Sequence, residues 1–421
     1  MFGRSCRFLS RTLQRTVKIA IVGGSGSSTP ALFLTPELLA LADKLEVTLI
    51  GRSESRLRAV RRAIEILTDA SIRVETTLDF DRLEGASLVV LQARYGGYEA
   101  RMRDESFPLR HGICGDEGLG PGGLAAAWRS WPQLSKTLDK IGRRCPRAKV
   151  LLMTAPLSVL VRCANLAFRE IDVAGICELP WVTLLSACDA LRLPVADAQF
   201  GYAGINHLGW FDHLSSDSAD LIPRYASTRR GARFPSFELI TSLKAIPLKY
   251  LVLHYERIGT LRRQRTSLAR GAELRSIQQR AMQAFLSGGR QQIVAALHAR
   301  PTPWYSDALG PFIAATAGLH TSTVFFLSRP NDGYLPCFAP DDTLEQPFVV
   351  YGGSCRRLAR RDECPPGLVQ TLRQFVDYER AAAQAVLANR RSACATVLAK
   401  HPWTKNCSDM DALASDLIAA V

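Results

Sequence analysis

Short apolar runs alternate with longer amphipathic segments through the first half of the chain. Four of these runs are short and apolar enough to be buried strands, namely residues 17–22, 46–50, 87–91 and 148–153. Segments with helical periodicity separate them, at residues 31–45, 54–68 and 124–141. Strands that alternate with helices favour a parallel sheet with helices on both faces. We therefore predict an α/β fold in which residues 17–200 form a Rossmann-like, doubly wound parallel sheet.

Beyond residue 211 the pattern changes to longer helices, with short strands expected near residues 324–327 and 348–351. This pattern predicts an α+β domain over residues 201–421. We expect this domain to bind the substrate and the metal and to form the contacts between subunits. Residues 1–16 are basic and contain no acid. A transit peptide, a disordered extension or a start codon assigned too early would each explain that composition, and we exclude these residues from the fold.

The composition is typical of a globular protein, with 47% hydrophobic and 22% charged residues among 421. No apolar run reaches the roughly 20 residues of a transmembrane helix, so no membrane partner is expected. The net charge of +14 comes from scattered lysines and arginines, and no nucleic-acid-binding motif accompanies them. An anionic small molecule is therefore the expected partner, although arginine-rich coding bias would give the same charge. The 11 cysteines form no CxxC pair and follow no secretory signal, which predicts a cytoplasmic location.

The first apolar run leads directly into a glycine-rich turn. Five residues of this turn are the expected contacts for a dinucleotide: Gly23, Gly24, Ser25, Gly26 and Ser27. Glycines let the backbone approach a pyrophosphate closely where a strand ends and a helix begins. The spacing is not G-x-G-x-x-G, so the turn alone is a motif of moderate specificity.

The second run ends in Gly51, Arg52 and Ser53. NAD enzymes of this fold usually carry an acid roughly 20 residues beyond the glycines, where it binds the ribose 2′-hydroxyl. No acid stands here, and Arg52 offers a positive charge to a 2′-phosphate. We therefore expect NAD or NADP as the cofactor and favour NADP. The alternative is that Arg52 stacks on adenine or faces solvent.

Residues 90–123 hold eight glycines among many charged residues. Glycine allows close approach of the backbone, and the charges suit an anionic or polyhydroxylated ligand. A disordered loop is the alternative, but apolar residues are interleaved where disorder would be polar throughout. The order of the characteristic positions is Gln92, Arg94, Gly96, Gly97, Arg101, Asp104, Glu105, Pro108, Gly112, Gly115, Glu117, Gly120, Gly122 and Gly123. This order resembles glycoside hydrolase family 4, the NAD- and metal-dependent glycosidases typified by 6-phospho-glucosidases.

Two further motifs extend the resemblance. Cys177, in Ala-Gly-Ile-Cys-Glu-Leu-Pro, resembles the family's metal-binding cysteine, and His207, in Gly-Ile-Asn-His, resembles its second metal ligand. A lone cysteine is more often a small core residue, so the resemblance carries this prediction. Thiolate and imidazole suit a transition metal, here expected to be Mn²⁺. The residue after the cysteine is the catalytic acid in the family's 6-phospho-α-glucosidases. That implies Glu178 as the acid, and a solvated carboxylate is the alternative.

The resemblance also implies a base and three substrate contacts. Tyr250, in Ile-Pro-Leu-Lys-Tyr-Leu, falls on the tyrosine that removes the proton from carbon 2 of the sugar. A free tyrosine, with a pKa of about 10, needs a nearby positive charge to act near neutral pH. The implied substrate contacts are Arg94, Asn206 and Arg270, and a plain surface arginine is the alternative for Arg270.

In the reaction that the resemblance implies, NAD(P)⁺ takes a hydride from carbon 3 of the sugar. The base removes the proton on carbon 2, the aglycone leaves, water adds and the hydride returns. Such a glycosidase would act on an unidentified sugar, phosphorylated or otherwise anionic, and would assemble as a homodimer or homotetramer. A sugar oxidoreductase or epimerase that does not cleave the bond, and a non-catalytic family member, are the alternatives.

Three departures from the family pattern bear on that choice. Leu152 and Ala155 replace both asparagines of the family's Asn-Phe-Thr-Asn-Pro, and an alanine side chain can neither donate nor accept a hydrogen bond. Gly118 ends Asp-Glu-Gly where the family has Gln-Glu-Thr. Arg300 begins Arg-Pro-Thr-Pro where the family has Lys-Arg-Gly-Gly, which weakens the inference of a phosphorylated substrate.

Overall fold

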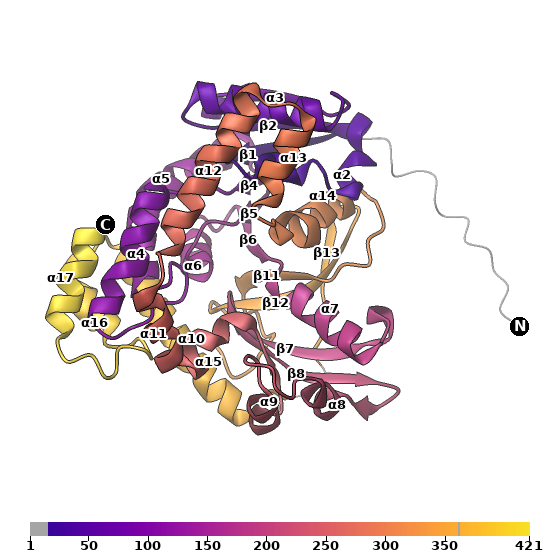
Figure 1. Ribbon diagram of the computed structural model, residues 1–421. Coiled ribbons are helices and arrows are strands. Elements are labelled where there is room, and N and C mark those ends of the chain that lie inside the picture. The colour runs from indigo at the N-terminus through magenta and orange to yellow at the C-terminus, as the bar shows by residue number, and fades with distance from the viewer. Residues whose placement is uncertain (1–15, 361–362) are drawn as a thin grey trace, which may run out of the picture.

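A nine-stranded sheet runs through the centre of the molecule (Figure 1). The computed structural model describes residues 16–360 and 363–421. The strand order is β13-β12-β11-β6-β5-β4-β1-β2-β3, and the six strands from β6 to β3 are parallel. Strand order reverses between β1 and β4, which confirms the predicted doubly wound, Rossmann-like fold. The strands are β1 (Val17–Val22), β2 (Leu45–Ile50), β3 (Arg73–Thr77), β4 (Leu88–Leu91), β5 (Lys149–Leu152), β6 (Asp172–Cys177), β11 (Phe325–Pro330), β12 (Thr343–Tyr351) and β13 (Ser354–Arg357).

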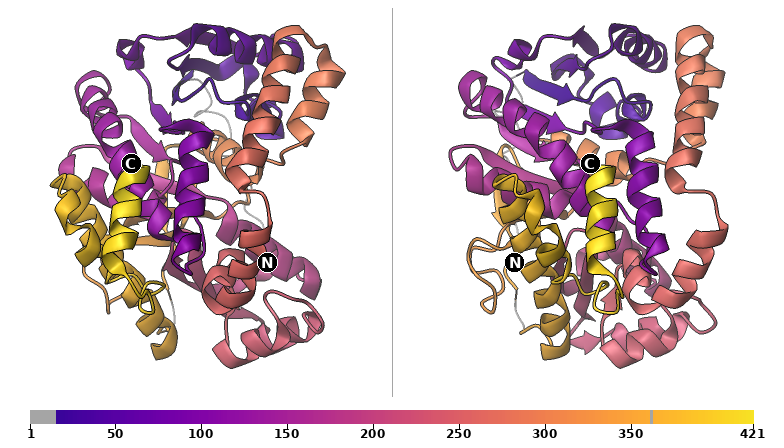
Figure 2. Two further views of the ribbon diagram at one scale, coloured as in Figure 1. Left: turned by 60° about the vertical axis from the view of Figure 1, so that its left-hand side comes forward. Right: turned by 90° about the vertical axis from the view of Figure 1, so that its left-hand side faces the viewer.

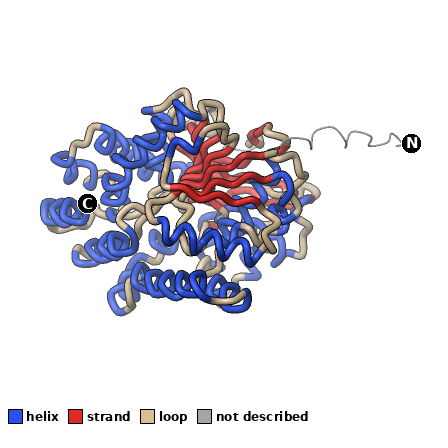
Figure 3. The backbone as a smooth tube through the Cα atoms, turned by 90° about the horizontal axis from the view of Figure 1, so that it is seen from above, coloured by secondary structure: helices blue, strands red, loops and turns tan. Residues whose placement is uncertain are grey.

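Both faces of the parallel strands are buried, because successive side chains of a strand point to opposite faces. In β1, Ala20 and Val22 pack into one apolar cluster, whereas Ile19 and Ile21 pack into another. Helices lie over each face (Figure 3). The first face is covered by α5 (Pro121–Arg144), α6 (Leu157–Ala167) and α15 (Pro366–Leu387). The second face is covered by α1 (Thr29–Leu32), α3 (Glu54–Leu67), α12 (Arg270–Ser287) and α14 (Gly310–Thr316).

The second half of the chain contributes antiparallel strands, as expected for an α+β region. β11 pairs with β6, and β12 and β13 extend the sheet beyond it. A smaller sheet contains β7 (Gln199–Ile205), β8 (Leu208–Ser216), β9 (Ala219–Asp220) and β10 (Ile246–Pro247). The helices not yet named are α2 (Pro36–Leu39), α4 (Gly97–Arg110), α7 (Leu179–Leu191), α8 (Ile222–Thr228), α9 (Phe237–Leu243), α10 (Val252–Tyr255), α11 (Arg257–Thr266), α13 (Arg290–His298), α16 (Cys394–Leu398) and α17 (Met410–Ala420).

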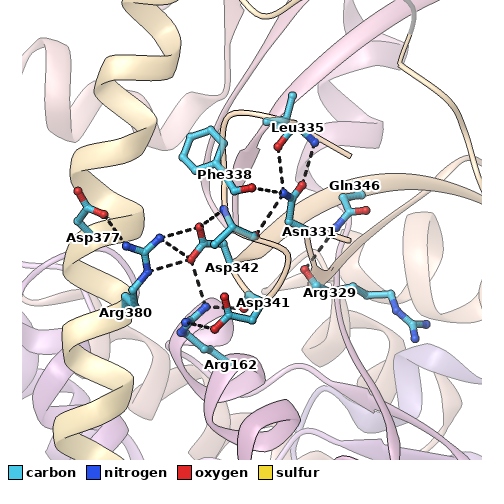
Figure 4. A network of polar contacts seen from close by, with 11 residues as sticks. Arg162, Arg329, Asn331, Leu335, Phe338, Asp341, Asp342, Gln346, Asp377 and Arg380 are labelled. Carbon is cyan, nitrogen blue, oxygen red and sulfur yellow. Dashed lines mark hydrogen bonds and ion pairs between the residues drawn. The ribbon is translucent and has the colours of Figure 1, made fainter. Parts of the chain in front are cut away.

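A buried ionic network joins these two halves (Figure 4). Asp342, which is fully buried just before β12, accepts hydrogen bonds from Arg380 of α15, the shortest at 2.7 Å. Arg162 of α6 also donates to Asp342, at 3.3 Å. These contacts join α6, α15 and the connection between β11 and β12. Residues on either side of position 200 therefore share one core. The predicted domain division at residue 200 stays a prediction.

One segment differs from the expected pattern, and another forms a helix where no element was predicted. Residues 31–45 form two short helices and a turn, because Thr35 precedes a proline and is extended, with φ −70° and ψ 134°. Within the glycine-rich stretch, residues 97–110 form α4, which begins after Gly96 at a φ of +82°. A Cβ at Gly96 would lie 2.5 Å from the Cβ of Ala100, so only glycine fits at this helix start.

The C-terminal helix α17 is part of the folded core of helices. The C-terminal α17 packs along α4, beside the glycine-rich stretch (Figure 2). Residues 1–15 of the predicted basic extension lie outside the described residues. In the described part of the chain, no helix has both the length and the apolar character that crossing a membrane requires.

Candidate active site

Cys177 lies where a parallel strand ends, the edge at which open α/β sheets bind ligands. β6 ends in Cys177, and the tight turn between β7 and β8 carries Asn206 and His207. Tyr250 lies in a 3₁₀ turn that follows β10. The structure brings these residues together, since Tyr250 stacks on His207 and the charge of Cys177 acts on Tyr250.

The nucleotide turn, residues 23–27, folds tightly against neighbouring strands. The amides of Gly23 and Gly24 both donate to the Ile50 carbonyl, at 2.9 and 3.1 Å. Gly23 has a φ of +88°, and a Cβ there would lie 2.7 Å from the Cα of Ala93. This close packing explains the glycines, and it uses the amides of Gly23 and Gly24 within the fold itself.

Arg52 is exposed at the end of β2, beside that turn. At the preceding position a Cβ would lie 3.1 Å from Oγ of Ser25, so Gly51 leaves little room for an acid. Burial raises the pKa of Tyr95, and Arg52 is close enough to lower it in part. Arg52 and Tyr95 therefore lie near each other beside the end of the nucleotide turn.

Cys177 and His207 have the chemistry of a metal-binding pair. Burial lowers the pKa of His207 to about 4, so its imidazole is neutral and able to ligate. His207 Nδ1 is buried and has no hydrogen-bond partner among the described residues, which suits a ring held for a ligand. Burial and the nearby Glu178 raise the pKa of the Cys177 thiol, which must lose its proton to bind a cation. The described residues contain no group of three or more His, Cys, Asp or Glu side chains placed to hold a metal, so this pair would leave positions for substrate and water.

Glu178 and Tyr250 lie on either side of this pair. Glu178 precedes α7, and its Oε2 lies 3.6 Å from Sγ of Cys177. The rings of Tyr250 and His207 are parallel, with centroids 4.2 Å apart. Burial raises the pKa of Tyr250, with Asp116 adding to the effect and Arg101 opposing it. A cation bound beside His207 would oppose the same rise, because it favours the phenolate.

Asn206 contacts a buried acid that the sequence interpretation did not single out. Glu345 in β12 is fully buried and accepts a 2.5 Å hydrogen bond from the Tyr202 hydroxyl. Burial raises the pKa of Glu345 to about 8, and the hydroxyl and the Asn206 amide oppose the rise. The same amide lowers the pKa of Cys177, so Asn206 lies between the two groups. The sequence signal that could have identified Glu345 is a single acidic residue within the mostly apolar segment that forms β12.

Gly209 explains why a glycine follows the Asn-His pair. A Cβ at this position would lie 2.3 Å from the Tyr202 hydroxyl oxygen. The glycine therefore makes room for the hydroxyl that binds Glu345. Gly118 is different, because a Cβ there would lie 3.4 Å from Nδ1 of His207, which is an ordinary contact.

Three arginines surround one carboxylate next to the metal-binding pair. Glu117 accepts from Arg94 at 3.2 Å and pairs with Arg101 at 2.7 Å, and the charge of Arg300 also acts on it. Burial alone would raise the pKa of Glu117, but these arginines outweigh it and lower the pKa to about 2. We call Arg94, Arg101 and Arg300 the arginine cluster. Arg101 also pairs with Glu105 at 2.7 Å, so Glu105 and Glu117 partly neutralise the three guanidinium groups. Guanidinium groups gathered in this way can bind an anionic ligand.

Only Arg94 of this cluster was among the predicted site residues. Arg101, Glu117 and Arg300 had family or charge signals, but nothing in the sequence showed that α4 and the segment before α14 would meet. Arg270 was predicted to contact substrate. It is exposed at the start of α12 and pairs with Glu273 at 2.5 Å. Its role in substrate binding stays a prediction.

A doubly wound sheet with a glycine-rich first turn is typical of dinucleotide-dependent enzymes. The sequence model described as "Family 4 glycosyl hydrolase" matches residues 18–192, and that of the family's C-terminal domain matches residues 202–404. The chain therefore belongs to family 4 of the glycosyl hydrolases, as its sequence predicted, and it is a glycosidase by family.

Individual relatives support the same assignment. The 6-phospho-beta-glucosidase BglT of Thermotoga maritima is 23% identical over 96% of this chain and 98% of its own length. A crystal structure of the 6-phospho-beta glucosidase from Thermotoga maritima with NAD and glucose-6-phosphate has a TM-score of 0.87, at 21% identity, and covers 96% of this chain and 98% of that one. A 6-phospho-alpha-glucosidase from gut microorganisms, with NAD and Mn²⁺, has a TM-score of 0.80 at 19% identity and covers 96% and 97%.

Proposed function

We propose that this protein is an NAD(P)- and divalent-metal-dependent glycosidase that acts on a phosphorylated sugar. The observation that carries the proposal is the convergence of Cys177, His207 and Tyr250 beside the arginine cluster. A phosphate would meet guanidinium groups, which bind it through paired hydrogen bonds. This support offsets the loss of the family's Lys-Arg-Gly-Gly run, because Arg300 still reaches the cluster.

The chain's own groups would divide the work as follows. The nucleotide turn would hold the dinucleotide, and Cys177 and His207 would hold Mn²⁺. When bound, the dinucleotide accepts and later returns a hydride at carbon 3, and the metal polarises the oxygen there. Tyr250 would take the proton from carbon 2, and Glu178 would give a proton to the departing oxygen. Asn206 would contact substrate beside the metal, and Arg94 and Arg270 would bind its anionic group.

Glu178 supports an acid-assisted reaction, which leans toward an α-linked substrate. Ala155 follows β5 and offers no polar group to a sugar hydroxyl, and Gly118 lies beside His207. Both residues alter the surroundings of the sugar and leave the arginine cluster in place. We also propose a preference for NADP, because Arg52 is exposed beside the nucleotide turn and Gly51 leaves no place for an acid.

The direct test is a glycosidase assay in solvent deuterium. The protein, purified with reductant, would be given Mn²⁺, nucleotide and the 4-nitrophenyl α- and β-glucoside 6-phosphates, with the unphosphorylated glucosides as controls. We expect aglycone release that needs both Mn²⁺ and nucleotide, with deuterium at carbon 2 of the product. An epimeric product or net nucleotide reduction without aglycone release would indicate an oxidoreductase or epimerase instead.

Nucleotide preference is tested separately by titration. Wild-type protein should bind NADP more tightly than NAD, and Arg52→Gln should lose that difference while keeping its affinity for NAD. At least equal affinity of the wild type for NAD would contradict the preference. A cytoplasmic location and a homodimeric or homotetrameric assembly also stay predictions, and size-exclusion chromatography with light scattering would measure the assembly.

A further inference from the structure

The segment between α13 and α14 contacts both the nucleotide turn and the arginine cluster. It contains Arg300, Trp304 and a π-helical turn at Tyr305–Leu309. Such turns are rare and often occur at functional sites. A Cβ at Gly310, where α14 begins, would lie 2.7 Å from Oγ1 of Thr35, so the end of the segment is pressed against the α1–α2 connection.

At one end, Tyr305 holds the nucleotide turn through Gln92. The buried Tyr305 hydroxyl donates to Oε1 of Gln92 at 2.7 Å. Nε2 of Gln92 in turn donates to Oγ1 of Thr29 at 3.0 Å and to the Gly23 carbonyl at 3.4 Å. Gly23 is the first of the predicted dinucleotide contacts, and Thr29 follows the last of them by two residues. The Tyr305 hydroxyl therefore orients the side-chain amide of Gln92, which donates hydrogen bonds to both ends of the nucleotide turn.

At the other end, Arg300 belongs to the arginine cluster. Its Nη1 donates to the Tyr98 hydroxyl at 2.9 Å, and its guanidinium lies over the Trp304 ring, 4.9 Å from the centroid. Burial lowers the pKa of Arg300, and repulsion from Arg94 and Arg101 adds to that effect. An anion bound among these arginines would relieve the repulsion and hold Arg300 in place.

We infer that residues 300–305 couple the two binding sites, with Tyr305 as a positioning residue for the nucleotide turn. An anionic sugar at the arginine cluster would fix Arg300, and this would restrict Tyr305 and Gln92 to the arrangement that holds the turn closed on a dinucleotide. By linkage, a bound dinucleotide would raise the affinity for the anionic sugar by the same factor. The inference rests on the proposed function, since it takes both ligands from it.

The coupling is measured by calorimetric titration of the whole protein in the presence of Mn²⁺. The dissociation constant of NAD would be determined with and without saturating glucose 6-phosphate, and that of glucose 6-phosphate with and without NAD. We expect each ligand to lower the dissociation constant of the other by about 5-fold or more, within the usual range for allosteric coupling. Equal constants would overturn the inference while leaving the proposed function intact, because both ligands would still bind.

Variants then test whether the segment carries the coupling. Tyr305→Phe should reduce the mutual effect to less than about 2-fold and leave the affinity for glucose 6-phosphate alone unchanged. Gln92→Met removes the same link from the other side, so it should cause the same loss, and the double variant should lose nothing further. Tyr351→Phe, an exposed tyrosine on β12, is the matched control and should keep the full effect.

Each remaining outcome also decides the matter. Full coupling in both Tyr305→Phe and Gln92→Met would mean that the ligands affect each other by another route, which overturns the inference. Failure of wild-type protein to bind either ligand would overturn the proposed function and the inference together. The coupling is first measured in the wild-type protein. The inference can therefore be contradicted even if a variant fails to fold.

Discussion

At the residue scale, the candidate site consists of groups whose ordinary reactivity is altered by burial. His207 is kept neutral, the Cys177 thiol is hard to ionise and Tyr250 is a weak acid as it stands. A divalent cation is the common remedy, because its charge favours thiolate and phenolate and needs a neutral imidazole. The three residues are therefore expected to depend on one bound metal.

Cys177→Ser should lower the affinity for Mn²⁺ by about 100-fold or more, because serine is a far poorer ligand near neutral pH. Titration with Mn²⁺ followed by electron paramagnetic resonance measures this. Cys188→Ser, a buried cysteine in α7, is the matched control and should bind Mn²⁺ like the wild type. Unchanged affinity in Cys177→Ser would remove the cysteine from the site.

Tyr250→Phe should lower kcat by roughly 10²–10⁴-fold, the range for loss of a general base. Binding of NAD and Mn²⁺ should stay unchanged, since the ring still stacks on His207. The second readout is the exchange of the carbon 2 proton with solvent deuterium, which should disappear. Tyr255→Phe serves as the control, and exchange at the wild-type rate in Tyr250→Phe would rule out the proposed role.

At the element scale, α6 and α15 pack around a second buried acid. Glu379 lies in α15, and Ser158 of α6 donates to it. Burial raises the pKa of Glu379 to about 8, and Asp342 adds to the rise, whereas Ser158 and Arg162 oppose it. This carboxyl group stays protonated at pH values where the same group in the unfolded chain, with an ordinary pKa of 4.5, has ionised.

The stabilising effect of a protonated Glu379 is therefore complete below about pH 4.5 and is lost as the pH rises toward about 8. The free energy of unfolding of the wild type should fall as the pH rises through that window. Glu379→Gln should make this fall smaller, by roughly 1.4 kcal/mol for each unit of pKa shift that the substitution removes. Urea unfolding between pH 5 and 8 measures the slopes. Glu345 and Asp104, whose pKa values are also raised by burial, should preserve part of the slope.

The matched control for this prediction is Glu84→Gln, which removes an exposed glutamate near the start of β4. Its slope should equal that of the wild type. If Glu379→Gln also shows the wild-type slope, Glu379 ionises at the same pH in both states, and its burial has no consequence for stability.

At the scale of the whole molecule, the ionic network in Figure 4 ties the two regions matched by the family models. Arg162 lies in the first region, and Asp342 and Arg380 lie in the second. Asp342→Asn would leave a neutral amide between the buried Arg162, which keeps its contact with Asp341, and the partly exposed Arg380. We expect a loss of about 2–3 kcal/mol in the free energy of unfolding, less than the usual cost of breaking a fully buried ion pair.

Urea unfolding followed by circular dichroism and tryptophan fluorescence tests this expectation. Asp377→Asn is the control, because Asp377 contacts the same Arg380 but is half exposed, and its loss should cost less than about 1 kcal/mol. We also expect the two probes to report one transition in the wild type. Separate transitions would show that the regions unfold as independent domains.

The sequence determined the fold class, because the periodicity of apolar residues is local and survives without tertiary contacts. Motifs whose residues are adjacent in the chain also predicted Gly23, Cys177, His207 and Tyr250 as site residues. Where the sequence interpretation was wrong it was local as well, because a proline divides the expected helix at residues 31–45.

Only the tertiary structure decided which distant residues share a site. Glu345 joins Asn206 because β12 packs against β7, and Arg300 joins Glu117 because the segment before α14 contacts α4. Charge alone could not select these residues from 53 lysines and arginines and 39 acids, since most such side chains face solvent. Burial is what gives a charge its chemical consequence, and burial is a property of packing over the whole chain.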